Sequence, residues 1–333
     1  MRKFLRNIAF FALPFLAGLI YLFAGPYDKE YGYNMVTKDC RTGNWIYRRL
    51  YESPHPVDVA FLGTSKTMCD VNDALLQERL ANEAGLDVEV ANFGICRKGE
   101  NLHYLIARDL FEHKPPRYLF VEVSTHTAEK GHFHFPYLAD AGDLAAAPIW
   151  VNQGYLSDMG DFAWNRFIYH RESTLGIERK FNDFLDNPQH SFMAVANDIA
   201  QDEGSMAAVA EKRKRELTTE IPEGLVGWWY RQSLKAPQHY YRKIVELAQA
   251  HGTQVFFLYL PVYGTPGNAP REMDFYQEFG PVLIPPDSVF TVPEWHMDDS
   301  HLNQVGAGKL SDWLTGSLKN ILTGNLPAGQ RVE

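Results

Sequence analysis

Residues 57–72 read VDVAFLGTSKTMCDVN, an apolar run that gives way to small polar residues. Branched and aromatic side chains dominate residues 57–62, which is typical of a strand buried inside a sheet. Gly63 permits a tight turn, and Ser65 follows just before the helical pattern of residues 74–85, ALLQERLANEAG. Backbone N–H groups and a helix dipole would favour negative charge beside this serine. The stretch predicts either a nucleophile at the carboxyl edge of an α/β sheet or an ordinary capping serine.

A second stretch whose residues could take part in catalysis lies near the carboxyl end, where residues 296–310 read HMDDSHLNQVGAGKL. Asp298 precedes His301 by three residues, and a helical pattern of apolar residues follows. A nucleophilic serine needs a base that takes its proton, and the base needs a carboxylate that holds its tautomer. We therefore predict a triad of Ser65, His301 and Asp298. The alternative is a helix-capping acid beside a surface histidine.

Two more strands are predicted to end in candidate site residues. Residues 88–93 read VEVANF and are followed by Gly94, while residues 118–123 read YLFVEV and are followed by Ser124. Strands that alternate with helices predict a parallel sheet with right-handed connections. Ligands of such sheets bind outside the carboxyl ends of the strands. Ser65, Gly94 and Ser124 are therefore expected at one edge of the sheet.

The strand and helix pattern resumes late in the chain. Residues 254–260, QVFFLYL, predict a fourth strand, and residues 288–292 predict a short fifth strand. Tyr263 lies in the loop after the fourth strand, where it could reach the site and bind substrate. A helix over the apolar positions from Ala307 to Leu318 closes the domain.

The intervening residues 125–232 interrupt this alternation and are predicted to form a cap over the sheet edge. His126, His132 and His134 could bind a metal, but no carboxylate or cysteine partner stands at a characteristic spacing. Loop and surface histidines are the favoured interpretation, and no metal or other cofactor is predicted. Tryptophans in this part could stack on sugar rings or fill a core; they include Trp150, Trp164, Trp228 and Trp229.

The chain has three cysteines, Cys40, Cys69 and Cys96. An odd number leaves at least one thiol unpaired or paired between chains. Cys69 and Cys96 follow the first and second strand turns, so they could form a disulfide bond. Buried free thiols are the alternative.

The amino terminus has the pattern of a membrane anchor. Three basic residues precede an apolar, uncharged run at residues 8–25, and its length of about 18 residues is enough to cross a bilayer. The basic flank should remain in the cytoplasm, which places residues 26–333 outside it. A cleaved signal peptide and a buried soluble helix are the alternatives.

Three motifs resemble those of the SGNH/GDSL hydrolase superfamily: FLGTS at 61–65, NFG at 92–94 and DDSHLNQVGAGKL at 298–310. The resemblance is strongest to its membrane-anchored branch, which includes the D-alanyl-lipoteichoic-acid protein D family and the alginate O-acetylation proteins. It covers residues 55–125 and 238–320. It implies a three-layer α/β sandwich with a central parallel sheet.

The resemblance also implies roles for individual residues. Ser65 matches the nucleophile, His301 the base and Asp298 its orienting acid. The backbone N–H groups of Ser65 and Gly94 match donors to the oxyanion. The family has an asparagine after its third strand, where this chain has Ser-Thr-His at 124–126, so one oxyanion donor stays unassigned.

At 333 residues, the chain suits one large domain that carries an insertion. We expect an anchor at 1–25 and an α/β domain formed by 26–124 and 233–333, with the cap at 125–232. The net charge of −9 argues against a nucleic-acid partner.

The expected protein is a single-pass protein of the bacterial inner membrane with a periplasmic serine esterase or O-acyltransferase domain. Its substrates would be acyl esters, acetyl esters above all, of a cell-surface polysaccharide, and a membrane-bound O-acyltransferase would be its partner. The alternative is a noncatalytic or weakly active factor that binds polymer during cell-envelope assembly.

Overall fold

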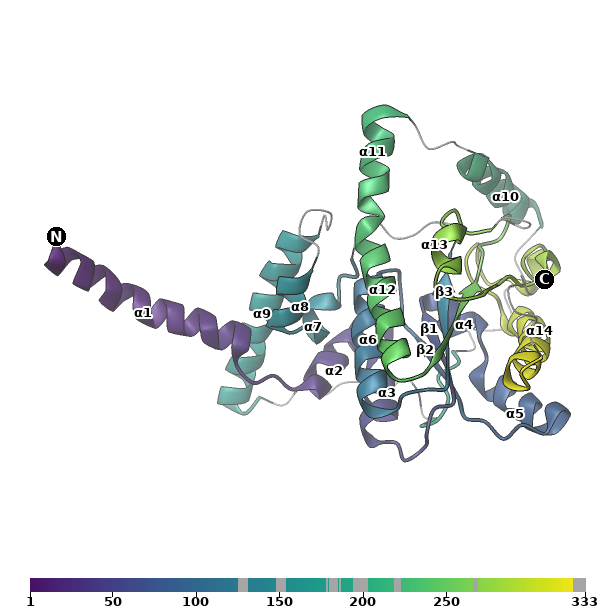
Figure 1. Ribbon diagram of the computed structural model, residues 1–333, viewed down its shortest axis with the longest axis horizontal. Coiled ribbons are helices and arrows are strands. Elements are labelled where there is room, and N and C mark those ends of the chain that lie inside the picture. Colours follow the sequence, from purple (N-terminus) through teal and green to yellow (C-terminus); the bar gives the residue numbers. More distant parts are fainter. Residues whose placement is uncertain are drawn as a thin grey trace.

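A sheet of five parallel strands forms the centre of the molecule (Figure 1). The computed structural model describes residues 1–124, 131–147, 154–177, 179, 185, 187–193, 203–218, 223–265 and 269–325. Within this part the strand order is β2-β1-β3-β4-β5, with bounds β1 Val59–Gly63, β2 Val90–Gly94, β3 Tyr118–Val123, β4 Gln254–Tyr259 and β5 Val282–Leu283. The parallel sheet and its helices confirm the predicted α/β class.

Helices cover both faces of the sheet, because successive strand residues point to opposite sides. In β1, Ala60 and Leu62 belong to one core with α6 and α12, whereas Val59 and Phe61 belong to a second core with α5 and α14. Strands buried on both faces are apolar throughout, which is why four of them could be predicted. The covering helices are α5 Asp73–Ala84, α6 Glu100–His113, α12 Lys235–Ala250 and α14 Gln304–Leu322.

The prediction of a fifth strand at residues 288–292 is wrong. Residues Asp287–Phe290 form a 3-10 helix, η2, and the fifth strand lies earlier, at Val282–Leu283. The side chains of Val289 and Phe290 are buried in the core with α14. A short apolar stretch has no clear period, so its sequence looks the same whether it forms a buried strand or a buried 3-10 helix.

The helix predicted after the first strand is divided into two. The short helix α4, Ser65–Asp70, begins at the nucleophile candidate, and α5 begins three residues after α4 ends. Asn72 separates them, because its side-chain oxygen accepts a hydrogen bond of 3.0 Å from the Leu75 N–H and so caps α5.

The amino-terminal helix α1, Arg2–Ala24, projects away from the rest of the molecule (Figure 1). Its segment Arg6–Ala24 is long and apolar enough to cross a membrane, by length and composition. The chain then continues through short helices that pack beside the sheet: α2 Lys29–Cys40, α3 Gly43–Tyr47 and the π-helix η1 Arg48–Glu52.

The described part of residues 125–232 is helical, with α7 Phe135–Leu138, α8 Ala141–Ala146, α9 Tyr155–Leu175, α10 Glu203–Thr218 and α11 Gly224–Ser233. Helix α9 contacts α1 and α7, and α7 contacts α2 and α6. This group lies beside the anchor, while α10 and α11 lie farther along the molecule (Figure 1). A cap that covers the sheet edge stays a prediction.

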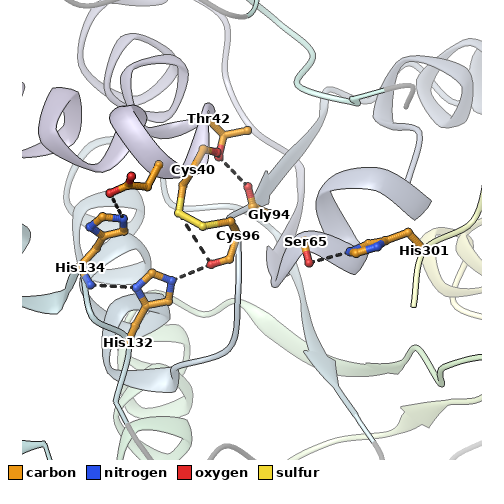
Figure 2. The surroundings of a disulfide bond; sticks show 9 residues. Cys40, Thr42, Ser65, Gly94, Cys96, His132, His134 and His301 are labelled. Atoms are coloured by element: carbon orange, nitrogen blue, oxygen red, sulfur yellow. Dashed lines mark hydrogen bonds and ion pairs between the residues drawn. A yellow bond between two sulfur atoms is a disulfide. The ribbon is translucent and has the colours of Figure 1, made fainter. Parts of the chain in front are cut away.

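One disulfide bond joins the amino-terminal helices to the sheet. It links Cys40, the last residue of α2, to Cys96, which follows β2 (Figure 2). The bond considered between Cys69 and Cys96 therefore does not form. Cys69 lies in α4 as a buried free thiol, which is the alternative considered for it.

Candidate active site

Ser65 is the first residue of α4 and follows the end of β1 directly. Thr64 caps this helix, since its hydroxyl accepts a hydrogen bond of 3.2 Å from the Lys66 N–H. Gly63 is required here for space: a Cβ at this position would collide with the Thr67 hydroxyl and the Glu122 carboxylate. The strand therefore turns into the helix within two residues and presents the serine hydroxyl at the sheet edge.

The structure brings Ser65 and His301 together although 236 residues separate them. The Ser65 Oγ atom lies 2.8 Å from His301 Nε2 (Figure 2). His301 Nδ1 lies 2.9 Å from both carboxylate oxygens of Asp298. When Nδ1–H donates to the carboxylate, Nε2 is the nitrogen that can accept the serine proton. This is the geometry that a serine, a base and an orienting acid require.

The carboxylate of Asp298 is held by its own loop. It accepts hydrogen bonds from the backbone N–H groups of Ser300, at 2.7 Å, and His301, at 2.8 Å. Burial would raise the pKa of Asp298, but the hydrogen bonds from the His301 ring and these N–H groups outweigh burial and hold it below its ordinary value. Asp298 is therefore ionised at neutral pH.

The imidazole of His301 is influenced by two carboxylates. Burial favours its neutral form, but the hydrogen bond to Asp298 and the charge of Asp70 outweigh burial and raise the pKa of His301 above its ordinary value. Asp70 ends α4 and is fully buried. Its Oδ1 atom accepts a hydrogen bond of 2.8 Å from the Leu302 N–H, so it joins the nucleophile helix to the histidine loop.

A buried ion pair lies beneath the nucleophile turn. Lys66 Nζ is 3.4 Å from a carboxylate oxygen of Glu122, and only 4% and 1% of the two side chains are exposed. Glu122 also accepts hydrogen bonds from the N–H and hydroxyl groups of Thr64 and Thr67. Burial would raise the pKa of Glu122, but Lys66 and these donors outweigh burial and lower it. The carboxylate thus binds the amino-terminal turn of α4 to β3.

These supporting residues were not predicted from the sequence. The signal for Glu122 was a single acid within the apolar strand YLFVEV, because a charged residue in a buried strand needs a partner. The partner, Lys66, follows the serine directly. Asp70 had a weaker signal, because an acid at the end of a short polar segment is common on protein surfaces.

Gly94 lies at the end of β2, but its backbone N–H is engaged. It donates a hydrogen bond of 2.8 Å to the side-chain oxygen of Asn92, and the Gly94 carbonyl accepts one of 3.1 Å from the Thr42 hydroxyl (Figure 2). A Cβ at Gly94 would collide with the Met68 backbone, so glycine permits α4 to approach β2. Its role as an oxyanion donor stays a prediction, and it requires the bond to Asn92 to open.

The two predicted substrate-binding residues lie at the same sheet edge. Ser124 directly follows β3 and is half-buried. Tyr263 lies in the loop after β4, is largely buried, and donates its backbone N–H to the Asp299 carbonyl at 3.0 Å. The Tyr263 ring packs edge-on against His296, with ring centroids 5.0 Å apart. Tyr263 is thereby attached to the Asp298–His301 loop, and contact of either residue with substrate stays a prediction.

No family model matches this chain, and no curated protein matches it. The functional inference therefore depends on the geometry of Ser65, His301 and Asp298 and on the motifs that contain them.

Two histidines of the middle stretch, His132 and His134, are packed beside the disulfide bond. His132 and His134 are buried, so the interpretation as surface histidines is wrong for both. His132 Nε2 lies 2.6 Å from the Cys96 carbonyl oxygen, and His134 Nε2 lies 3.4 Å from an Asp39 carboxylate oxygen (Figure 2). They pack around the disulfide bond because the loop that carries them lies against it.

The cluster of Cys40, Cys96 and His132 is a poor metal site while the disulfide bond is formed. Cys40, Cys96 and His132 place their donor atoms within 4.8 Å of one another, but the two sulfur atoms are bonded to each other. His126 and Trp150 lie outside the described residues. The other tryptophans of the middle stretch, Trp164, Trp228 and Trp229, are exposed, which argues against a core role for them.

Proposed function

We propose that the protein is a membrane-anchored serine esterase or O-acyltransferase of the SGNH type. The observation that carries this proposal is the chain of contacts from Ser65 Oγ to His301 Nε2, at 2.8 Å, and from His301 Nδ1 to Asp298, at 2.9 Å. The all-parallel sheet, with the serine at the carboxyl end of β1, supports it. The three-layer arrangement of the SGNH family is part of the same proposal.

The reaction proceeds through an acyl-enzyme. Ser65 Oγ attacks the acyl carbonyl while His301 Nε2 takes its proton, and Asp298 stabilises the imidazolium. The tetrahedral intermediate then collapses, and His301 gives the proton to the leaving alcohol. Water or a sugar hydroxyl attacks the acyl-enzyme in turn, with His301 taking its proton. This attack forms a second tetrahedral intermediate. When that intermediate collapses, His301 returns the proton to Ser65, and an acid or a new ester is released.

The oxyanion formed in each step needs hydrogen-bond donors. The Ser65 N–H lies in the first turn of α4, where backbone N–H groups have no acceptor within the helix. One such donor is worth about 3 kcal/mol to the transition state. The Gly94 N–H is the second donor of this proposal once it leaves the Asn92 oxygen.

The substrate class follows from the motifs and the anchor. The resemblance to teichoic-acid and alginate modification proteins favours acyl esters, acetyl esters above all, on a cell-surface polysaccharide. Three basic residues directly before the apolar run of the anchor favour a bacterial inner-membrane protein with a periplasmic domain. A membrane-bound O-acyltransferase that supplies the acyl group would be its partner.

A second candidate function is polymer binding during envelope assembly, without efficient catalysis. One observation favours it: the Gly94 N–H is engaged by Asn92. A site with a single free oxyanion donor would lose roughly 10²–10³ in rate. The exposed Trp228 and Trp229 of α11 would suit contact with sugar rings.

Variants of the triad distinguish these functions. We expect wild-type protein to react with a fluorophosphonate probe and to hydrolyse a short-chain aryl ester. Ser65→Ala should lose both reactions, and His301→Ala should lose nearly all activity, because each change disables the same step. Asp298→Asn should keep a reduced rate, since this residue orients and stabilises the base. The double variant Ser65→Ala/His301→Ala should be little worse than either single variant.

The matched control is Ser157→Ala, which removes an exposed hydroxyl from α9 and should leave labelling and hydrolysis unchanged. The acyl content of the surface polymer in cells reports the same variants in vivo. Full activity of a well-folded Ser65→Ala protein would exclude serine catalysis and leave polymer binding as the function.

A further inference from the structure

An apolar groove lies where the membrane anchor meets α9. It has a volume of about 650 Å³, which is within the range of pockets that hold small ligands, ~300–1,000 Å³. The anchor contributes residues between Pro14 and Leu22, and α9 contributes residues between Phe167 and Leu175. The groove therefore begins on a helix that is apolar enough to cross a membrane.

Helix α9 is held across the end of α1 by aromatic contacts (Figure 1). The rings of Phe23 and Phe162 have centroids 5.2 Å apart, and those of Tyr21 and His170 have centroids 4.4 Å apart. The Arg166 guanidinium lies 3.4 Å from the centroid of the Tyr27 ring. These contacts use one face of α9 and fix the direction of the neighbouring face.

The neighbouring face of α9 carries an exposed stripe of large apolar residues. Leu156, Trp164, Phe167 and Leu175 are 82%, 61%, 45% and 64% exposed, and their spacing places them on one side of the helix. The carboxyl-terminal half of this stripe lines the groove. A stripe of this kind is typical of a helix that lies in the membrane interface, where tryptophan is enriched.

One basic residue stands in the same stripe. Arg171 is 47% exposed, and its guanidinium lies 3.5 Å from a Glu172 carboxylate oxygen. That carboxylate already accepts two closer hydrogen bonds from Arg179, at 2.5 and 2.7 Å. The Arg171 guanidinium thus has donors available at the rim of the groove, and arginine binds phosphate groups well.

From these features we infer that α1 and α9 form a binding site for an anionic phospholipid. An acyl chain would occupy the groove beside Gly18, and the phosphate would contact Arg171. The groove is continuous with the apolar surface of α1, so a chain within the bilayer reaches it without leaving lipid. The site concerns the anchor and does not depend on the chemistry of Ser65.

A substitution that fills the groove tests this inference. Gly18 lines the groove, and a Cβ added there meets no atom within 4 Å, so Gly18→Leu should occupy the space without disturbing the helix. The control is Gly316→Leu in α14, where an added Cβ also meets no atom within 4 Å. Each full-length protein is reconstituted in vesicles of phosphatidylglycerol and phosphatidylcholine in equal amounts, extracted in mild detergent and weighed by native mass spectrometry.

We expect wild type and Gly316→Leu to retain phosphatidylglycerol in preference to phosphatidylcholine. Gly18→Leu should reduce the retained lipid at least tenfold, and Arg171→Gln should abolish the preference between headgroups. Wild-type protein without bound lipid, or Gly18→Leu with the same bound lipid as wild type, would overturn the inference. A wild-type dimer without lipid that Gly18→Leu converts to monomer would show instead that the groove binds a second α1 helix.

Tryptophan fluorescence provides an independent measurement. Phospholipids with brominated acyl chains quench tryptophans that lie in the bilayer. Trp164→Phe should remove a quenched part of the signal, whereas Trp228→Phe, on the exposed face of α11, should leave that part unchanged. Equal quenching in both variants would show that α9 lies outside the bilayer and would also overturn the inference.

Discussion

His301 is the residue on which the proposed chemistry depends, and two acids influence it from different elements. Asp298 accepts the Nδ1 hydrogen bond from within the same loop. Asp70 lies at the end of α4, where burial raises its pKa to about 8. Its contact with the Leu302 N–H keeps a carboxyl group beside the imidazole. The titrations of His301 and Asp70 are therefore coupled.

The pH profile of ester hydrolysis tests this arrangement. The base must be neutral to take the serine proton, and the pKa of His301 is raised. The value of kcat/KM should therefore rise with pH through a midpoint above the ordinary histidine value of about 6.5. Asp70→Asn should shift the midpoint to lower pH, because it removes the ionised form of Asp70 that favours the imidazolium, while the amide oxygen still accepts the Leu302 N–H.

The control for this profile is Asp312→Asn, a substitution of an exposed carboxylate on α14 that pairs with Arg79. Its midpoint should equal that of wild type. A midpoint that is the same in Asp70→Asn and wild type would mean that the Asp70 charge does not influence the base.

At the scale of elements, the junction of β1, β3 and α4 determines where the serine stands. Glu122 of β3 accepts hydrogen bonds from the first turn of α4, and Lys66 balances its charge. Both side chains are buried, so water cannot solvate either charge. Ser65 is thus positioned by a carboxylate on a neighbouring strand, and the described hydrogen bonds of that carboxylate do not include Ser65.

Breaking this ion pair should destabilise the protein. Lys66→Met leaves a buried carboxylate without its cation, so we expect the free energy of unfolding to fall by about 3–5 kcal/mol. The double variant Lys66→Met/Glu122→Gln removes both charges and should lose less. Urea unfolding in detergent measures the difference. If the double variant loses as much free energy of unfolding as Lys66→Met and Glu122→Gln lose together, the two charges do not depend on each other.

The disulfide bond between Cys40 and Cys96 should stabilise the domain through the loop that it closes. With a separation of 56 residues, the loop-entropy relation gives about 4 kcal/mol. Cys40→Ser should lower the free energy of unfolding accordingly, and a reducing agent should lower that of wild type but not that of the variant. Cys69→Ala should keep the sensitivity to reductant, because Cys69 is a free thiol. Loss of this sensitivity in Cys69→Ala would contradict the pairing.

For the whole molecule, the anchor and the site lie in different parts. Helix α1 projects from one end (Figure 1). Ser65 begins α4 after β1, and His301 lies in the loop before α14. The cluster of Arg2, Lys3 and Arg6 directly before the apolar run gives the direction of insertion that we propose. If α1 crosses the membrane, the triad and any substrate polymer lie on the same side of it.

A fusion experiment tests that orientation. A reporter attached after Glu333 should be active in an exported compartment, because the basic flank retains the amino terminus in the cytoplasm. Replacing Arg2, Lys3 and Arg6 with glutamine should reduce the exported fraction. A reporter that is active only in the cytoplasm would contradict the proposed localisation.

The sequence by itself determined the features that depend on local pattern. Four strands were found because a strand buried on both faces is apolar along most of its length. Ser65 could be selected because it stands between a strand and a helix, and Asp298 and His301 because they stand three residues apart in the loop before the last helix. The apolar run of α1 needs no tertiary context at all.

Tertiary structure decided the features that depend on contacts between distant segments. The partner of Cys96 is Cys40 rather than Cys69, because α2 returns to the end of β2. The N–H of Gly94 is bound by Asn92, and Glu122 binds the turn of α4. Each depends on which elements lie side by side, and the periodicity of a single segment contains no information about its neighbours.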